Sequence, residues 1–109
     1  MKNCVFCKIA QKKISADFIY EDSDFFVISD LHPKVKIHLL IIPKKHLLLN
    51  KIGESEAKIL GRVFMIAAKL AKKLRVKTGY RLAINNGPDS GQEIEHLHIH
   101  FLAGEKLKF

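Results

Sequence analysis

The apolar side chains between residues 54 and 75 recur at every third or fourth position, which is the period of one face of an α-helix. Ser55 is the expected N-cap of this helix, and the acidic side chains beside it suit the positive end of the helix dipole. Lysines crowd the last turns, and Gly79 follows as a stop signal. The pattern therefore predicts one long helix over residues 54–75. A shorter run with the same period predicts a second helix over residues 5–10.

Five short runs are rich in β-branched and aromatic residues and are bounded by turn-forming residues, which predicts strands. They cover residues 18–21, 24–29, 37–42, 80–85 and 96–102. The order is short helix, three strands, long helix and two strands, which favours an α+β fold with a mostly antiparallel sheet. The sequence has no repeats, linkers or low-complexity stretches. We therefore expect a single domain over residues 1–109.

Composition and charge narrow the class of protein. The chain of 109 residues is 48% apolar, which excludes a disordered protein. Its 19 basic and 11 acidic side chains give a net charge of +8, which suits a nucleotide, a nucleic acid or a membrane surface without choosing among them. No apolar run reaches the roughly 18–20 residues of a spanning helix, and the N-terminus lacks a signal-peptide pattern. We expect a soluble, cytoplasmic protein with no membrane partner.

The last predicted strand carries the most informative pattern. His96, His98 and His100 alternate strictly with apolar residues, and alternate residues of a strand share one face. The apolar set should therefore pack on the core while three imidazoles project together from the other face. Such a row can bind a metal, or it can carry out phosphoryl or nucleotidyl transfer with an imidazole nucleophile. A polar outer face that is merely rich in histidine is the weaker interpretation, because three of the six histidines share this register.

Two other segments have the chemistry of a nucleotide site. Gly87 and Gly91 precede the histidine strand, and glycine lets backbone N–H groups approach a phosphate closely. A plain connecting loop explains these glycines nearly as well. Asp30 ends the second predicted strand and could accept hydrogen bonds from ribose hydroxyls, although taken alone it is better explained as a turn residue.

The only cysteines, Cys4 and Cys7, are separated by two residues near the N-terminus. In a reducing compartment this spacing indicates a metal half-site, a redox pair or an inert pair rather than a structural disulfide. No strand precedes the pair, which disfavours redox chemistry. With His46 and one strand histidine the pair would complete a Cys2His2 zinc set, but spacing alone does not show that these residues converge.

The segment from His96 to Leu102 reads His-Leu-His-Ile-His-Phe-Leu and matches the motif of the histidine triad (HIT) family. Upstream segments occur in the family's order, including Cys-Val-Phe-Cys-Lys-Ile at residues 4–9 and Leu-Ile-Ile-Pro-Lys-Lys-His at residues 40–46. The chain resembles the bacterial nucleoside phosphoramidase (Hint-like) branch of that family over essentially its whole length. The resemblance implies a five-stranded antiparallel sheet with one long and one short helix. It also implies a homodimer with a continuous ten-stranded sheet.

The resemblance implies a reaction as well. His98 would attack the α-phosphorus of a purine nucleoside 5′-phosphoramidate, form a nucleotidyl-histidine intermediate and release the nucleoside monophosphate after hydrolysis. His100 would contact the phosphoryl oxygens and help to move the leaving-group proton, while His96 and His46 would orient the nucleophile. The residues matching the family's nucleotide site are Asn85, Gly91, Gln92 and Glu93 at the phosphate, Asp30 at the ribose, and Val5, Phe6, Ile9, Ile28 and Leu31 at the purine.

Some bacterial members bind zinc through two N-terminal cysteines and two histidines, and the matching set is Cys4, Cys7, His46 and His96. We expect a structural zinc that clamps the N-terminal helix to the sheet and that catalysis does not require. Glu93 stands where many eukaryotic members carry a serine near the leaving group, and a carboxylate there would be repelled by a phosphate unless it is protonated or turned aside.

The resemblance leaves several alternative functions open. They are a dinucleoside polyphosphate hydrolase, a DNA-deadenylating enzyme or another HIT nucleotidyl hydrolase or transferase, a hydrolase with a catalytic zinc on the triad, and a non-catalytic nucleotide-binding module. Nucleic acid is not the expected partner, because the sequence carries no appended zinc finger or basic arm.

Overall fold

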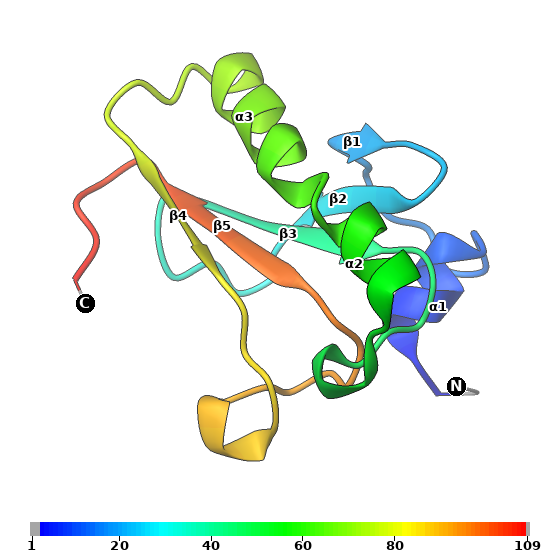
Figure 1. Ribbon diagram of the computed structural model, residues 1–109. Coiled ribbons are helices and arrows are strands. Elements are labelled where there is room, and N and C mark those ends of the chain that lie inside the picture. Colours follow the sequence, from blue (N-terminus) through cyan, green and yellow to red (C-terminus); the bar gives the residue numbers. More distant parts are fainter. Residues whose placement is uncertain (1–2, 109) are drawn as a thin grey trace.

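The computed structural model describes residues 3–108. Its centre is a five-stranded antiparallel sheet in the order β1-β2-β3-β5-β4 (Figure 1). The strands are β1 (Tyr20–Glu21), β2 (Phe25–Ser29), β3 (Ile37–Pro43), β4 (Tyr80–Ala83) and β5 (Ile99–Ala103). The helices are α1 (Val5–Ala10), α2 (Glu54–Leu60) and α3 (Val63–Lys73), with 3-10 turns at Leu49–Lys51 and Pro88–Ser90. The α+β class, the sheet and the short N-terminal helix are as predicted.

A long helix is present as predicted, but its bounds over residues 54–75 are wrong, because the chain forms α2, a turn and then α3. Glycine is the weakest ordinary helix former, and Gly61 ends α2. Arg62 follows it and forms ion pairs with Asp22 and Asp24 in the β1–β2 turn. Ser55 is not the N-cap either. Helix α2 begins after Gly53, whose N–H donates to the Glu56 carboxylate at 2.7 Å.

The sheet buries two separate apolar layers. Helix α3 presents Val63, Ile66, Ala67 and Leu70 to the main core, which includes Ile99, Phe101 and Ala103 of β5. The opposite face carries a smaller core in which Phe6 and Ile9 of α1 pack with Phe26, Leu40 and Ile42. Helix α1 therefore covers the β2–β3 part of that face, while β4 and the C-terminal segment lie at the other end of the sheet (Figure 1).

The histidine segment differs from the prediction in its pairing. Strand β5 begins at Ile99, so His96 and His98 lie in the chain that leads into it. The ladder of this segment ends with the Ala83–His100 pair on the β4 side and with the Ile41–Ile99 pair on the β3 side. Alternation nevertheless continues through the segment, since Leu97, Ile99 and Phe101 are in the main core as predicted. None of the helices described within residues 3–108 is both long and apolar enough to cross a membrane.

Candidate functional site

A cavity of about 400 Å³ lies on the α1 side of the sheet, between the chain after β2 and the loop before β5. It brings together most of the residues expected at a nucleotide. The expected residues that line it are Val5, Phe6, Ile28, Asp30, Leu31, Asn85, Gly91, Gln92, Glu93, His98 and His100. Ile9 does not line it and is buried with Phe6 in the smaller core. The lining combines apolar and polar side chains, as a nucleoside with a phosphate would require.

The ring of His98 is held by the main chain. Its Nδ1 lies 2.7 Å from the carbonyl oxygen of His96, and Phe6 packs edge-on against it with ring centroids 5.2 Å apart. A carbonyl oxygen only accepts hydrogen bonds, so Nδ1 carries the proton and donates it. The lone pair of neutral His98 is therefore on Nε2. This is the tautomer that a nucleophile at the cavity requires.

His38, which the sequence analysis did not single out, lies next to His100. The backbone N–H of Lys34 donates to His38 Nδ1 at 3.1 Å, so the proton of neutral His38 is on Nε2. That Nε2 lies 2.8 Å from His100 Nδ1 and 3.4 Å from an Asp30 carboxylate oxygen. His38 therefore donates to His100 Nδ1, which places the proton of His100 on Nε2. No local pattern marks His38, because its contact with His100 depends on the pairing of β3 with β5.

The protonation states of this histidine pair follow from burial. Burial, together with the neighbouring His98 and His38, lowers the pKa of His100 to about 4. Burial also lowers the pKa of His38. Both rings are therefore neutral near pH 7. His100 Nε2 is buried without a hydrogen-bond partner among the described residues, which makes it a donor that a phosphoryl oxygen would satisfy.

Asp30 and Gln92 have structural partners as well. One Asp30 oxygen accepts from the backbone N–H of His32 at 2.8 Å, so the turn role of Asp30 is present beside its exposure to the cavity. Gln92 braces the loop before β5, because its oxygen accepts from Gly87 N–H at 2.8 Å and its amide donates to the Ile94 carbonyl at 3.0 Å. Gly91 has φ +90°, a left-handed conformation that favours glycine.

A second cluster is formed by Cys4, Cys7, His46 and His96, whose ligand atoms all lie within 4.8 Å of one another. His96 Nδ1 is 3.2 Å from Cys4 Sγ, 3.6 Å from Cys7 Sγ and 3.2 Å from His46 Nδ1. Cys7 Sγ is 3.3 Å from His46 Nδ1. The ligand–ligand edges of a tetrahedral zinc site are roughly 3.3–3.8 Å long, so this set fits zinc closely.

The protonation of His96 supports the same assignment. Its Nε2 donates to the Pro43 carbonyl at 2.8 Å, which leaves a lone pair on Nδ1 toward the two sulfur atoms. Burial lowers the pKa of His96 to about 4, so the ring is neutral as a ligand must be. The structure thus places His46 in this cluster, in contact with His96 and Cys7, rather than beside His98.

Comparison with known proteins identifies the family. The HIT domain model matches residues 11–107. The chain belongs to the HIT domain family. The HIT protein HitA of Neisseria gonorrhoeae is 39% identical over 103 residues, which are 94% of this chain and 96% of HitA.

Solved HIT structures superpose over nearly the whole chain. A HIT family hydrolase from Clostridium thermocellum is 40% identical with a TM-score of 0.93, covering 99% of this chain and 96% of its own. A zinc-bound histidine triad family protein from Mycobacterium smegmatis is 33% identical with a TM-score of 0.82, covering 99% and 81%. A histidine triad nucleotide-binding protein from Candida albicans is 31% identical with a TM-score of 0.80, covering 91% and 73%. The five-stranded sheet described above is therefore the HIT fold.

Proposed function

We propose that this HIT protein is a hydrolase that cleaves the P–N bond of purine nucleoside 5′-phosphoramidates. The observation that carries the proposal is the tautomer of His98, which holds an Nε2 lone pair at a cavity of nucleotide size. The relatives described as a hydrolase and as a nucleotide-binding protein support the same class of activity. A module that only bound nucleotides would not need a nucleophile oriented in this way.

The reaction proceeds in two displacements at phosphorus. His98 Nε2 forms a bond to the α-phosphorus, and the P–N bond to the amine breaks with its electron pair leaving on the amine nitrogen, which takes up one proton. Water then attacks the same phosphorus, the bond to Nε2 breaks, and one proton returns to solvent. The sum is phosphoramidate plus water giving nucleoside monophosphate plus amine. Such covalent catalysis divides one difficult step into two easier ones.

The remaining polar groups have separate tasks in this scheme. His100 Nε2–H donates to a phosphoryl oxygen as charge develops there, and guides the proton to the leaving amine. His38 keeps His100 in the tautomer that can donate. Asp30 and Asn85 line the cavity where the ribose and the phosphate would lie. Gln92 acts through the loop that it braces, since both ends of its amide are already hydrogen bonded.

The Cys4, Cys7, His46 and His96 cluster would hold a zinc ion in this proposal. Zn²⁺ would supply structural cross-linking there, because it would tie both cysteines of the α1 region to the ring of His96 and to the chain after β3. His96 also provides the carbonyl oxygen that orients His98, so the cluster positions the nucleophile without contacting substrate.

A homodimer with a continuous ten-stranded sheet also belongs to the proposal. Strand β4 is an edge of the five-stranded sheet, and an edge strand is a ready template for pairing with another chain. Large apolar side chains are exposed on α3 and beside this edge, at Phe64, Met65, Tyr80 and Ile84. A second copy of the chain would cover both the edge and these side chains.

Trapping the intermediate tests the reaction directly. Wild-type protein mixed with a radiolabelled adenosine 5′-phosphoramidate and quenched in alkali should carry label on one peptide, with the adduct on His98 by mass spectrometry. The His98→Ala variant should lose turnover by orders of magnitude, because its imidazole forms the bond to phosphorus. AMP binding should stay near normal, because His98 is one of many residues that line the cavity. Equal turnover in the variant and the wild type would refute the proposal.

A further inference from the structure

The cavity that His98 and His100 line, described above, is called the nucleotide cavity here. A second cavity, of about 450 Å³, lies beside it and beneath the C-terminal segment. It is lined by the chain before β3, by β4 and β5, and by the residues that follow β5. Its lining residues include Lys34, Val35, His38, Arg81, Ala83, Asn85, His100, Leu102 and residues 105–108. No part of the nucleotide or of the leaving group has yet been assigned to this cavity.

His100 stands at the border of the two cavities. His100, Lys34 and Asn85 line both, whereas His98 lines only the nucleotide cavity. In an in-line displacement the leaving group departs on the side of phosphorus opposite the nucleophile. A phosphate held at His98 and His100 would therefore release its leaving group away from His98, toward the second cavity.

The second cavity is strongly basic. Lys34, Arg81, Lys106 and Lys108 line it, and none of these four side chains forms an ion pair with the residues described between 3 and 108. The one acidic residue in the lining is Glu105, whose carboxylate accepts the backbone N–H of Lys36 at 2.7 Å. A cleft lined by charge of one sign concentrates ligands of the opposite sign.

The strand register explains why Arg81 lies on the face of the sheet that carries His100. Ala83 pairs with His100 and Arg81 pairs with Leu102, so Arg81 is on the same face of the sheet as His100. Arg81 thus lines the cavity from the face of the sheet. The proposed dimer would instead use the backbone edge of β4, so the two features are compatible. The segment after β5 then brings Lys106 and Lys108 over the same area.

We propose that the basic cavity, defined by Lys34, Arg81, Lys106 and Lys108, is a leaving-group subsite that selects substrates whose leaving group carries a negative charge. The inference rests on the proposed function and makes it more specific. A carboxylate and a phosphate on the leaving group would both offer negatively charged oxygen atoms to these cations. The experiment compares leaving groups that carry one or the other.

The test uses adenosine 5′-phosphoramidates with leaving amines of matched length. The amines are β-alanine with a carboxylate, β-alaninamide with no charge, 1,3-diaminopropane with a cation, and 2-aminoethyl phosphate with a phosphate. We expect kcat/KM of the wild-type protein to be roughly tenfold higher for an anionic than for the neutral leaving group, and lowest for the cation. The ratio of kcat/KM for the carboxylate conjugate to kcat/KM for the phosphate conjugate shows which of the two anionic groups the subsite prefers. The preference should shrink as salt concentration rises.

Paired variants separate the cavity from the overall charge of the protein. The double variant Lys106→Gln and Lys108→Gln should lose most of the preference for anionic leaving groups while it hydrolyses the neutral conjugate at the wild-type rate. The matched control is Lys58→Gln with Lys72→Gln, which removes the same charge from exposed positions on α2 and α3. It should keep the preference. Turnover of the neutral conjugate shows that each variant is folded.

Several results would overturn the subsite. They are equal kcat/KM for anionic and neutral conjugates, a preference for the cation, and the same loss in the control variant. If no conjugate is hydrolysed, the proposed function fails instead. The dissociation constants of the wild-type protein for the intact conjugates then decide the subsite, which requires tighter binding of the anionic conjugates than of the neutral one.

Discussion

Single backbone groups set the tautomers of the histidines at this site. The carbonyl of His96 fixes the proton of His98 on Nδ1, and the N–H of Lys34 fixes the proton of His38 on Nε2. Neither group can reverse its role as donor or acceptor, so the pattern does not depend on a charged side chain. The consequence is a free lone pair on His98 Nε2 and a free N–H donor on His100 Nε2. Two neighbouring rings of the same residue type thereby present different groups.

The contact between His38 and His100 gives the first prediction. The His38→Ala variant should lower kcat by about 10- to 100-fold, because His100 would no longer be held in the donating tautomer. The His38→Gln variant should recover part of that loss, since an amide N–H can also donate to His100 Nδ1. Steady-state kinetics and AMP titration measure both effects. A loss of AMP affinity equal to the loss of kcat would contradict a positioning role for His38.

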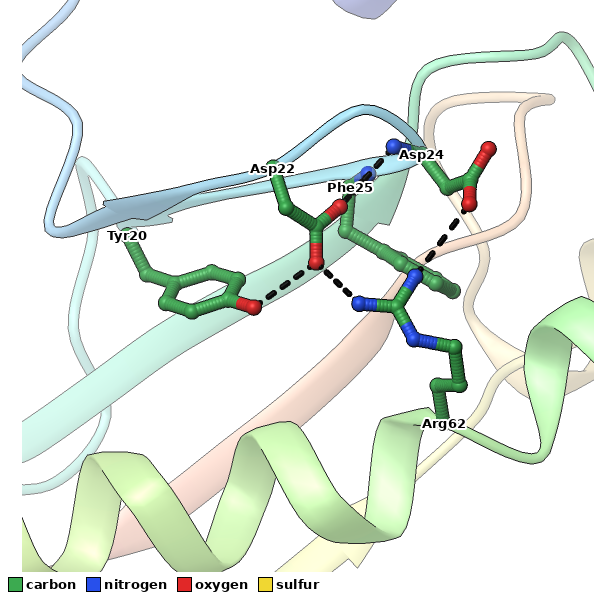
Figure 2. Close-up of polar contacts among 5 residues, drawn as sticks. All are labelled: Tyr20, Asp22, Asp24, Phe25 and Arg62. Carbon is green, nitrogen blue, oxygen red and sulfur yellow. Dashed lines mark hydrogen bonds and ion pairs between the residues drawn. The ribbon is translucent and has the colours of Figure 1, made fainter.

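At the level of elements, a polar cluster joins the β1–β2 turn to the break between α2 and α3 (Figure 2). Asp22 accepts from Tyr20 at 2.7 Å, from the backbone N–H groups of Asp24 and Phe25, and from Arg62. Arg62 also reaches the Asp24 carboxylate at 3.2 Å. Arg62 is therefore held in the interruption between the two helices, where it faces both carboxylates.

This cluster predicts a stability that depends on pH. Burial alone would raise the pKa of Asp22, but the hydrogen bonds from Tyr20, the two backbone groups and Arg62 lower it from 3.8 to about 2. The ionised carboxylate thus stabilises the fold by about 2 kcal/mol above the unfolded pKa, and this contribution is lost as pH falls through about 2. Asp22→Asn should lower the free energy of unfolding in urea by about that amount at pH 7. The same loss at pH 2 would contradict the electrostatic explanation.

The cysteine–histidine cluster is a second connection between elements, because it joins α1 to the chain around His96 and the end of β3. In the absence of a cation, burial and the neighbouring Cys4 raise the pKa of Cys7 to about 11. A thiol with such a pKa stays protonated near neutral pH. A zinc ion would reverse this, because a coordinating thiol is deprotonated outright.

Metal content gives the third prediction. Protein purified without chelator should contain about one equivalent of zinc, and removal of the metal should lower the melting temperature and speed hydrogen exchange of the α1 amides. The Cys7→Ser variant should show the same faster exchange without chelation. Elemental analysis and exchange measured by mass spectrometry report these outcomes. Less than a tenth of an equivalent of zinc would reject the assignment.

At the scale of the whole molecule, the two faces of the sheet have different tasks. Helix α3 closes the main core on one face, while α1, the histidines and the C-terminal segment share the other. Both cavities open on that second face, one on each side of His100. The edge at β4 and the apolar side chains of α3 are also exposed.

The proposed dimer gives the fourth prediction. Light scattering at micromolar concentration should report a mass near twice that of the 12.4 kDa chain. The double variant Phe64→Glu and Met65→Glu should shift the mass toward the monomer, because these side chains are 72% and 58% exposed and add little to the core of one chain. Lys58→Glu on α2 is the control and should remain dimeric. A wild-type mass near 12 kDa would contradict the dimer.

The sequence by itself determined the features that depend on neighbours along the chain. Alternation in an extended segment places His98 and His100 on one side and Leu97 and Ile99 in the core wherever the ladder begins. The same reasoning established the strands and the short helix. The reasoning missed the break between α2 and α3 at Gly61 and Arg62. Glycine is a weak helix former, and Arg62 forms ion pairs with the β1–β2 turn, which is far away in the sequence.

Only the tertiary structure decided which distant groups meet. His38 and His100 are 62 residues apart, and Cys4 and His96 are 92 apart, so each contact depends on strand order and on where α1 docks. The basic cavity arises in the same way, from β4 meeting the segment after β5. Periodicity is local because it follows from backbone geometry, whereas these sites require register between segments that only the packed core fixes.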